Sequence, residues 1–224
     1  MANATMHYAI LDTGGSHSFP AEHALLAGAA KDLKSADIVI LLGEHAGRHA
    51  KSLPEWKDKV AVLIELGTES LGTFTGESRA EEGSNALGFA RFRLGDAEPT
   101  NLVELVRQPR TSDASIAAAK LLFEDAGLQV AVCGDFAGRI IDRLVRPYYN
   151  AALRRLDDGL ATADDLDTTL KLGLGYPEGP VALLERTGLA QHCDVTQALF
   201  EATGEQAYAP ARRARVAKLR QRKT

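Results

Sequence analysis

The ten residues KLGLGYPEGP, Lys171 to Pro180, contain three glycines and two prolines. The residues on both sides of this stretch have helical patterns. Thr162 followed by Asp165 resembles a capping box for a helix that runs to about Gly173, and VALLERTG (181–188) predicts the next helix. Glycine permits tight backbone turns, while proline ends one helix and suits the first turn of another. The stretch therefore predicts a sharp joint between two helices.

Helical spacing extends over the second part of the chain. A long helix is predicted from about Asp135 onward, and Pro147 inside it should kink it. CDVTQALFEATG (193–204) predicts a further helix, and ARRARVAKLRQRK (211–223) is a basic amphipathic segment. The apolar residues expected on one face of the long helix are Phe136, Ile140, Ile141, Leu144, Val145, Tyr148, Ala152, Leu153 and Leu156.

The first part of the chain alternates between strand and helix patterns instead. Two of its apolar runs, 37–43 and 59–67, lack polar alternation, which is typical of strands buried on both faces of a parallel sheet. Such alternation predicts an α/β layer, so we expect a shortened Rossmann-like domain over residues 1–133 and an all-α domain over 134–224. Strands are predicted at 7–13, 37–43, 59–67, 86–94 and 128–134, and helices at 20–36 and 111–127.

Composition and charge restrict the class of protein. The 224 residues are 45% hydrophobic, enough to bury a sizeable core, and the net charge of −4 argues against a general nucleic-acid binder. Two cysteines, Cys133 and Cys193, without a C-x-x-C motif indicate a reducing compartment and no cysteine zinc site. The N-terminus lacks a signal-peptide pattern, and no apolar run reaches the length of a membrane span. We therefore expect a cytoplasmic protein.

Two segments of the helical part resemble the C-terminal domain of the 3-hydroxyacyl-CoA dehydrogenase family: GDFAGRIIDRLVRPYYNAAL (134–153) and ATADDLDTTLKLGLGYPEGPVALLERTGL (161–189). The α/β part is similar to the family more weakly, in SADIVILLGEH (35–45), IELGTESLGTFT (64–75) and ALGFARFRLG followed by NLVELV (86–106). The positions of the helical part that match the family pattern are Gly134, Phe136, Arg143, Pro147, Tyr148, Ala152, Asp165, Asp167, Gly173, Gly175, Tyr176, Pro177, Gly179, Pro180, Leu183, Gly188 and Leu189.

This resemblance implies an NAD-binding domain, a helical dimerisation domain and an acyl-CoA held between them, in fatty-acid or aromatic-acid (phenylacetate-type) β-oxidation. It also implies roles for single residues. Glu104 stands where the family has the glutamate that orients its catalytic histidine, and Ser70 stands at a substrate-facing serine. Asp142 replaces the asparagine at the start of the long helix, and Glu44 matches a strand-end glutamate near the nicotinamide ribose.

Several residues depart from the chemistry of the family. Oxidising a secondary alcohol needs a base for the hydroxyl proton and a nicotinamide for the hydride. The histidine base is replaced by Ala90, which cannot accept a proton, so we interpret Glu104 as an acidic residue near a strand or loop surface. Glu69 and Ser70 occupy the positions of two serines of the family. The carboxylate of Asp142 would repel a developing enolate-like oxygen. Catalysis is therefore not expected.

The cofactor motif is also incomplete. A dinucleotide site has G-x-G-x-x-G between the first strand and its helix. TGGSHSFPAEH (13–23) offers only the pair Gly14 and Gly15, and only one strand–helix pair precedes the second strand. We therefore do not expect NAD to bind at these glycines, although the resemblance implies it. His45 and His49 supply at most half of a metal site, and no metal is expected.

The sequence thus favours a homodimeric family member that does not catalyse the NAD-linked reaction and that binds an acyl-CoA thioester or regulates a related enzyme. Two alternatives stay open. A working dehydrogenase would oxidise 3-hydroxyacyl-CoA to 3-oxoacyl-CoA with NAD. A structural or regulatory partner would form a heterodimer with a full-length homologue and would show no affinity for CoA.

Overall fold

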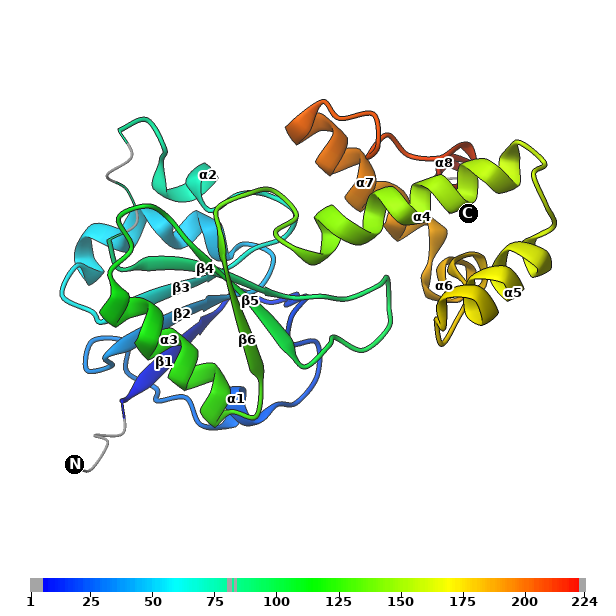
Figure 1. Cartoon of the computed structure of the whole chain (residues 1–224). Helices are drawn as coiled ribbons and strands as arrows, with labels where there is room; N and C mark the ends of the chain where they lie inside the picture. The colour runs from blue at the N-terminus through cyan, green and yellow to red at the C-terminus, as the bar shows by residue number, and fades with distance from the viewer. Residues whose placement is uncertain (1–5, 80–81, 83, 222–224) are drawn as a thin grey trace. The chain divides into compact units, whose positions relative to one another are not determined.

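The structure is a computed structural model that describes, of the 224 residues, 6–79, 82 and 84–221. It divides into two compact units. The α/β unit runs to Phe92 and resumes over Pro99–Arg139, while the helical unit consists of Arg93–Glu98 and the residues from Ile140 onward. All strands described below belong to the first unit, and α4 to α8 belong to the second (Figure 1).

The border between the units lies later in the chain than the predicted border at 133/134. The segment just after that point is bonded to the α/β unit. The carboxylate of Asp135 accepts hydrogen bonds from the backbone N–H groups of Leu71 and Gly72, at 2.6 and 2.7 Å. Because these bonds hold the segment, the helical pattern that begins near Asp135 does not become a helix until Ile141.

The α/β unit is built on one sheet of six strands that lie side by side in chain order, and this order has no reversal among the described strands. Neighbours are parallel from β1 to β4, β5 is antiparallel to β4, and β6 is parallel to β5. The mainly parallel, Rossmann-like layer is therefore confirmed. The sequence does not predict β5, whose apolar run is interrupted by Glu104. The strands are β1 (Tyr8–Asp12), β2 (Ile38–Leu42), β3 (Ala61–Glu65), β4 (Ala86–Arg91), β5 (Leu102–Arg107) and β6 (Gln129–Gly134).

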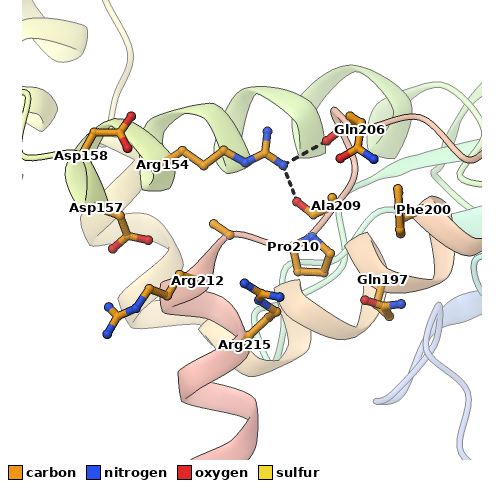
Figure 2. A pocket seen from close by; sticks show the side chains of 11 residues that line it. Arg154, Asp157, Asp158, Gln197, Phe200, Gln206, Ala209, Pro210, Arg212 and Arg215 are labelled. Atoms are coloured by element: carbon orange, nitrogen blue, oxygen red, sulfur yellow. Dashed lines mark hydrogen bonds between the residues drawn. The ribbon is translucent and has the colours of Figure 1, made fainter.

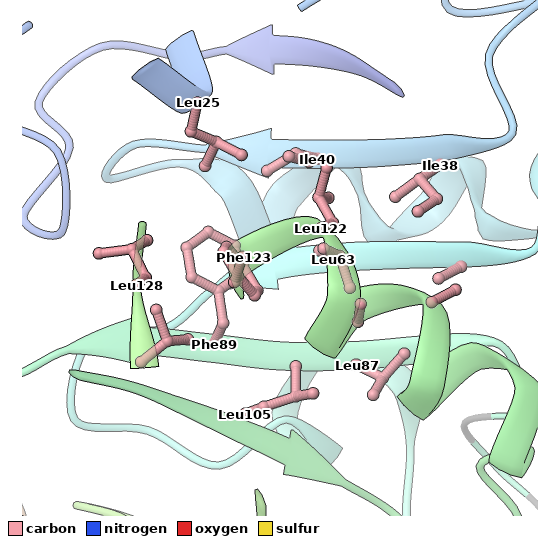
Figure 3. Close-up of a cluster of buried hydrophobic side chains, with 14 of the residues drawn as sticks. Leu25, Ile38, Ile40, Leu63, Leu87, Phe89, Leu105, Leu122, Phe123 and Leu128 are labelled. Atoms are coloured by element: carbon pink, nitrogen blue, oxygen red, sulfur yellow. The ribbon is translucent and has the colours of Figure 1, made fainter. Parts of the chain in front are cut away.

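Both faces of this sheet are covered. One face packs against α1 (Ala24–Ala27) and α3 (Asp113–Asp125) through a cluster of buried leucine, isoleucine and phenylalanine side chains (Figure 3). The opposite face packs against η1, a 3₁₀ helix over Ala46–Trp56, and against α2 (Gly72–Thr75). Every residue of β2 and β3 is buried, which explains why their sequences are unbroken apolar runs.

The helix predicted over residues 20–36 is wrong except for the single turn of α1. The chain after this turn pairs with the edge of the sheet, where the backbone N–H of Ala30 donates to the carbonyl of Tyr8 at 2.8 Å. The hydroxyl of Tyr8 donates to the carbonyl of Leu25 at 2.8 Å, and a Cβ at Gly28 would lie only 2.5 Å from that hydroxyl. Tertiary bonds to β1 thus override the helical propensity of an alanine-rich segment.

The helical unit contains the helices that the sequence predicts, and its basic tail is helical as well. Pro147 lies inside the long first helix, as expected. Thr162 caps the second helix through a hydrogen bond that its side chain accepts from the backbone N–H of Asp165. The helices are α4 (Ile141–Asp157), α5 (Ala163–Leu174), α6 (Pro180–Thr187), α7 (Leu189–Thr203) and α8 (Arg212–Gln221).

Two local requirements explain the glycine- and proline-rich joint between α5 and α6. Gly175 ends α5 with a φ of 71°, a left-handed conformation that glycine adopts without a steric penalty. The carboxylate of Asp167 in α5 accepts hydrogen bonds from the backbone N–H groups of Val181 and Ala182 in α6, at 2.9 and 2.8 Å. A Cβ at Gly179 would lie 2.2 Å from this Asp167 side chain. The joint therefore lets a carboxylate of one helix cap the next.

The apolar residues of α4 form only part of its buried face. Leu153 is fully buried, but Leu144 is 70% exposed. Three polar residues, Asp142, Arg146 and Asn150, are buried on the same helix at successive intervals of four. Buried polar side chains need hydrogen-bond partners, and these three residues have them.

Candidate functional site at the carboxyl ends of the strands

The carboxyl ends of β1 to β4 meet at one edge of the sheet, which is where ligands bind in open α/β sheets. The predicted cofactor residues Gly14, Gly15 and Glu44 all lie here. The carbonyl of Gly14 accepts a hydrogen bond from the backbone N–H of Glu44 at 3.0 Å. The Glu44 side chain lies over Gly15, where a Cβ would come within 2.8 Å of its Cγ atom. The structure thus brings the three predicted residues together.

At the same edge lies Glu65, the last residue of β3, which the sequence does not single out. It is only 6% exposed. Its Oε1 atom accepts hydrogen bonds from the backbone N–H of Ser18 at 2.6 Å and from the hydroxyl of Ser16 at 3.1 Å. Its Oε2 atom accepts one from the backbone N–H of Gly43 at 2.7 Å. One buried carboxylate therefore joins the loop after β1 to the turn after β2.

Arg91, the last residue of β4, holds the same loop from the other side. Its backbone N–H donates to the hydroxyl of Ser18 at 3.1 Å, and its Nη1 atom donates to the Ser18 carbonyl at 2.9 Å. Its guanidinium also lies over the ring of Phe19, 5.0 Å from the ring centroid. The loop 13–19 is thus bonded to the ends of β3 and β4 and lies across this edge of the sheet.

These contacts test whether a dinucleotide fits here. The pyrophosphate of NAD is bound by backbone N–H groups at the end of the first strand, and these groups must be available to it. The N–H of Ser18, in the loop after β1, already donates to Glu65, and the charge of that carboxylate would repel a phosphate at the same place. The residues present therefore do not fit the pyrophosphate of NAD at this edge.

The position of the family's catalytic base also lies near this edge. Ala90 of β4 is directly opposite Glu104 of β5 in the antiparallel register, and Glu104 is 1% exposed. The Nε atom of Arg139 lies 3.4 Å from Oε2 of Glu104. The interpretation of Glu104 as a surface acid is therefore wrong, because it is a buried member of an ion pair. A guanidinium remains protonated in proteins, so Arg139 cannot take over the work of an imidazole base.

The backbone of Arg139 supports a structural role for this ion pair. Arg139 has a φ of 52°, a left-handed conformation that is uncommon for a residue with a side chain. Such a conformation persists only where the surrounding contacts hold it in place. The contacts here include the ion pair to Glu104 and the neighbouring hydrogen bond from the N–H of Gly138 to the carbonyl of Thr68, at 2.9 Å.

Ser70 lies in the loop that this last hydrogen bond holds. Its hydroxyl lies 3.5 Å from the hydroxyl of Thr73 in α2. Because Gly138 bonds to Thr68, the loop with Ser70 and the segment with Arg139 are joined directly. The predicted residues Ser70 and Glu104 are thus brought to neighbouring segments of the α/β unit. Ser70 lies beside the hydroxyl of Thr73, and Glu104 lies beside the guanidinium of Arg139.

Asp142, the third predicted catalytic residue, belongs to the helical unit and is 7% exposed. Its carboxylate accepts a hydrogen bond from Nε of Arg146 at 2.7 Å, so its charge is balanced and its expected repulsion of an oxyanion is reduced. The Nη1 atom of Arg146 lies 3.1 Å from Nδ1 of His192, whose Nε2 atom lies 3.1 Å from Oδ1 of Asn150. Because arginine can only donate, His192 accepts at Nδ1 and donates at Nε2.

The protonation of His192 agrees with this arrangement. Burial, and to a lesser extent the charge of Arg146, lower the pKa of His192 to about 3. The imidazole is therefore neutral at neutral pH and connects α4 to α7. The spacing of Asp142, Arg146 and Asn150 is a visible polar stripe on α4, but no feature of the sequence points to His192 as its partner.

Cys133, His45 and His49 are further side chains that could in principle act as nucleophiles or metal ligands. Burial, followed by the charge of Glu104, raises the pKa of the Cys133 thiol to about 11, so it is not a thiolate at neutral pH. His45 and His49 lie at the start of η1. Among the described residues, no group of three histidine, cysteine or acidic side chains could hold a metal ion. No helix within those same ranges is long and apolar enough to cross a bilayer.

The mainly parallel sheet and the capped helical joint together define a Rossmann-like protein with a second, helical domain. Residues 138–223 match the family model described as 3-hydroxyacyl-CoA dehydrogenase, C-terminal domain. The crystal structure of the (S)-3-hydroxybutyryl-CoA dehydrogenase of Ralstonia eutropha superposes with a TM-score of 0.67 at 28% identity, over 82% of this chain and 65% of that one. The resemblance seen in the sequence is thus confirmed, and residues 138–223 belong to the C-terminal domain of the 3-hydroxyacyl-CoA dehydrogenase family.

Curated relatives give the extent of this similarity. The 3-hydroxybutyryl-CoA dehydrogenase of Bradyrhizobium diazoefficiens is 36% identical over 109 residues, which cover 49% of this chain and 37% of that protein. The 3-hydroxybutyryl-CoA dehydrogenase of Mycobacterium tuberculosis is 34% identical over 154 residues, which cover 68% of this chain and 53% of that protein. The chain therefore spans about half, or less, of the length of these relatives. Gly134 and Phe136 precede the residues that the family model matches.

Proposed function

We propose that the chain is a cytoplasmic family member that does not carry out NAD-linked hydride transfer and that binds an acyl-CoA thioester without oxidising it. The observation that carries the first part is the loop 13–19, which Glu65 holds across the strand ends through the N–H groups that a pyrophosphate would need. Ala90, at the position of the base and opposite Glu104 in the register, supports the same conclusion, because alanine cannot accept a proton.

The choice of ligand follows from the relatives. The names of the relatives from Bradyrhizobium diazoefficiens and Mycobacterium tuberculosis specify 3-hydroxybutyryl-CoA, so a short-chain acyl-CoA is the ligand class to test. Binding without oxidation would suit a protein that holds or delivers a thioester in fatty-acid or aromatic-acid β-oxidation. It would also suit a regulator of a related enzyme.

Calorimetric titration of the purified, folded protein tests both parts. We expect no heat with NADH and one-to-one binding of acetoacetyl-CoA. Tight one-to-one binding of NADH would contradict the first part and would restore the working dehydrogenase as the leading alternative. An absence of binding by acetoacetyl-CoA would contradict the second part and favour the structural or regulatory partner. Ala90→His adds a check, because restored NAD-dependent turnover by this single change would show that only the base is missing.

A homodimer forms part of the same proposal. Large apolar side chains are exposed on the helical unit: Leu144 is 70%, Leu160 67%, Leu172 82% and Leu174 64% exposed. Exposed apolar surface of this kind favours association with another protein surface. We expect a dimer in sedimentation equilibrium and a monomer for the variant L172D. The matched control is L219D on α8, where the native leucine is also exposed, and it should remain dimeric.

The heterodimer alternative makes a different prediction. If the exposed leucines bind a full-length homologue instead, the purified chain should sediment as a monomer. It should then form a stable one-to-one complex when the homologue is added. The same L172D variant should abolish that complex. A monomer that binds no homologue would contradict both forms of the proposal.

A further inference from the structure

The helical unit contains a pocket of about 590 Å³, and none of the predicted site residues lines it. It lies among the end of α4, α7, the segment before α8, and the first turns of α8 (Figure 2). Its volume is in the range of small-molecule sites, which usually measure a few hundred to about 1,000 Å³. All of its lining residues belong to the helical unit, so its shape is defined within that unit.

Three arginines line this pocket: Arg154, Arg212 and Arg215. Arg154 donates from Nη2 to the carbonyls of Gln206, at 3.0 Å, and of Ala209, so its guanidinium is held by neutral groups and keeps its full charge (Figure 2). Among the residues that the structure describes, the guanidinium groups of Arg212 and Arg215 form no ion pair. The pocket thus collects three positive charges that no carboxylate balances directly.

Two carboxylates also line the pocket, but each is paired with an arginine outside the lining. The Oδ1 atom of Asp157 lies 3.3 Å from Nε of Arg213, and its Oδ2 atom accepts from the backbone N–H of the same residue. The Oδ2 atom of Asp158 lies 2.9 Å from Nη1 of Arg155. Because these acidic charges are balanced from outside, the charge that faces a ligand remains positive. Guanidinium groups in such numbers are suited to phosphate oxygens, which they bind through two parallel hydrogen bonds.

The other walls of the pocket are apolar or amide-bearing. Phe200 and Gln197 of α7 and Pro210 of the segment before α8 also line it (Figure 2). An aromatic ring beside arginines offers a stacking surface for a flat base, as in nucleotide sites. Charge and shape together therefore indicate a ligand with phosphates at one end and a flat ring at the other.

We infer that this pocket binds the phosphorylated end of a nucleotide-like molecule, with Arg212 and Arg215 on the phosphates and Phe200 beside the base. This chemistry is shared by a free nucleotide and by the nucleotide end of CoA. The inference does not rest on the proposed function, because the pocket lies in the helical unit and uses none of the residues at the strand ends.

The test is calorimetric titration of the full chain with ADP, CoA, adenosine and inorganic phosphate. We expect ADP or CoA to bind at least tenfold more tightly than adenosine, because adenosine lacks the phosphates. We also expect either to bind more tightly than inorganic phosphate, which lacks the ring. Stronger binding of CoA than of ADP would identify the thioester's carrier as the ligand source, and the reverse order would identify a free nucleotide.

Substitutions of the pocket arginines test whether the ligand binds in this pocket. Arg212→Ala and Arg215→Ala should each weaken ADP or CoA binding about tenfold or more, since each removes a charged contact. The matched control is Arg110→Ala, an exposed arginine of the α/β unit outside the pocket, which should bind like the wild type. Equal affinity in the wild type and in the double variant of Arg212 and Arg215 would overturn the inference. So would the absence of binding by every probe at millimolar concentration to the folded protein.

The same variants separate this inference from the proposed function. Nucleotide binding at the strand ends would survive the loss of Arg212 and Arg215 and would change with Glu65→Gln. That result would overturn the pocket and would also contradict the proposal that Glu65 excludes a phosphate there. Binding that depends on the two arginines and is unchanged by Glu65→Gln would support the pocket and leave the proposed function standing.

Discussion

Two carboxylates of this protein, one in each unit, make the same kind of hydrogen bonds to the backbone. Asp167 in the helical unit and Glu65 in the α/β unit each accept hydrogen bonds from two backbone N–H groups beside glycine-containing turns. Asp167 is half-buried within α5, and its donors are the backbone N–H groups of the first turn of α6. Glu65 is buried, and its donors come from two other strand–loop segments.

The difference shows that the contribution of such a hydrogen bond to stability depends on its burial. At the helical joint, water can partly replace the carboxylate, so the contact is a helix cap of ordinary strength. At the strand ends, the N–H groups are buried, so losing the carboxylate would leave them without an acceptor and at a larger cost in stability. One contact caps a helix, and the other joins two loops at the strand ends.

The largest effect that we expect comes from Glu65→Ala. The change leaves the buried N–H groups of Ser18 and Gly43 without acceptors, and it should lower the free energy of unfolding by about 4 kcal/mol. Urea unfolding followed by the fluorescence of Trp56, the single tryptophan, reports on the α/β unit that contains it. The control Glu44→Ala removes an exposed carboxylate at the same edge and should change stability by less than about 0.5 kcal/mol. Equal effects of the two variants would show that Glu65 is no more than a surface acid.

Glu104→Ala should have the next largest effect. It removes one member of a buried ion pair and leaves the charge of Arg139 without its partner, which should destabilise the α/β unit by about 3 kcal/mol. The double variant Glu104→Leu, Arg139→Met removes both charges and should lose less stability than the single variant. The same fluorescence measurement checks both. A double variant with a lower free energy of unfolding than the single variant would show that other contacts of Arg139, and not the ion pair, hold this segment.

Lowering the pH tests the buried histidine of the helical unit. The pKa of His192 is lowered to about 3 in the folded protein from 6.5, so between these values the unfolded chain binds more protons and stability falls as the pH falls. From pH 7 to pH 5 the contribution of this one group is about 2 kcal/mol. Thermal melts followed by circular dichroism at the two pH values measure it. The variant His192→Gln should lose this part of the pH dependence, and an unchanged pH dependence would contradict the assignment.

The smallest effect is expected for Asp167→Ala. The loss of a half-buried helix cap should lower stability by about 1 kcal/mol, well below the effect at Glu65. Asp164→Ala, in the first turn of α5, is the control for a simple loss of helical charge. Circular dichroism melts of the two variants give the difference. If Asp167→Ala proved as damaging as Glu65→Ala, burial would not explain the contrast between the two carboxylates.

Much of the fold could be predicted because its determinants are local. The apolar runs of β2 and β3, the cap at Thr162 and the joint at Gly175 and Gly179 each depend on residues close in sequence. The segment 20–36 was mispredicted because its conformation depends on bonds to β1. Such bonds between distant segments leave no periodic pattern in the sequence.

The candidate site could be predicted only in part, for the same reason. The sequence identified Gly14, Gly15 and Glu44 as one group, and the structure brings them together. It also places Ala90 where the resemblance implies a histidine, an expectation that does not depend on neighbouring residues. It did not identify Glu65 or the partner of Glu104, because each acts through residues that are distant in the chain.

By itself, the sequence determined the family, the mainly parallel layer, the helical second domain and the absence of an imidazole at position 90. These depend on which residues are present and on their spacing along one segment. Only the tertiary structure decided that Glu65 occupies the strand-end N–H groups, that Glu104 is buried against Arg139, and that three arginines share one pocket. The physical reason is that the effect of a charge depends on its burial and on its neighbours in space, and both are set by contacts between segments far apart in the chain.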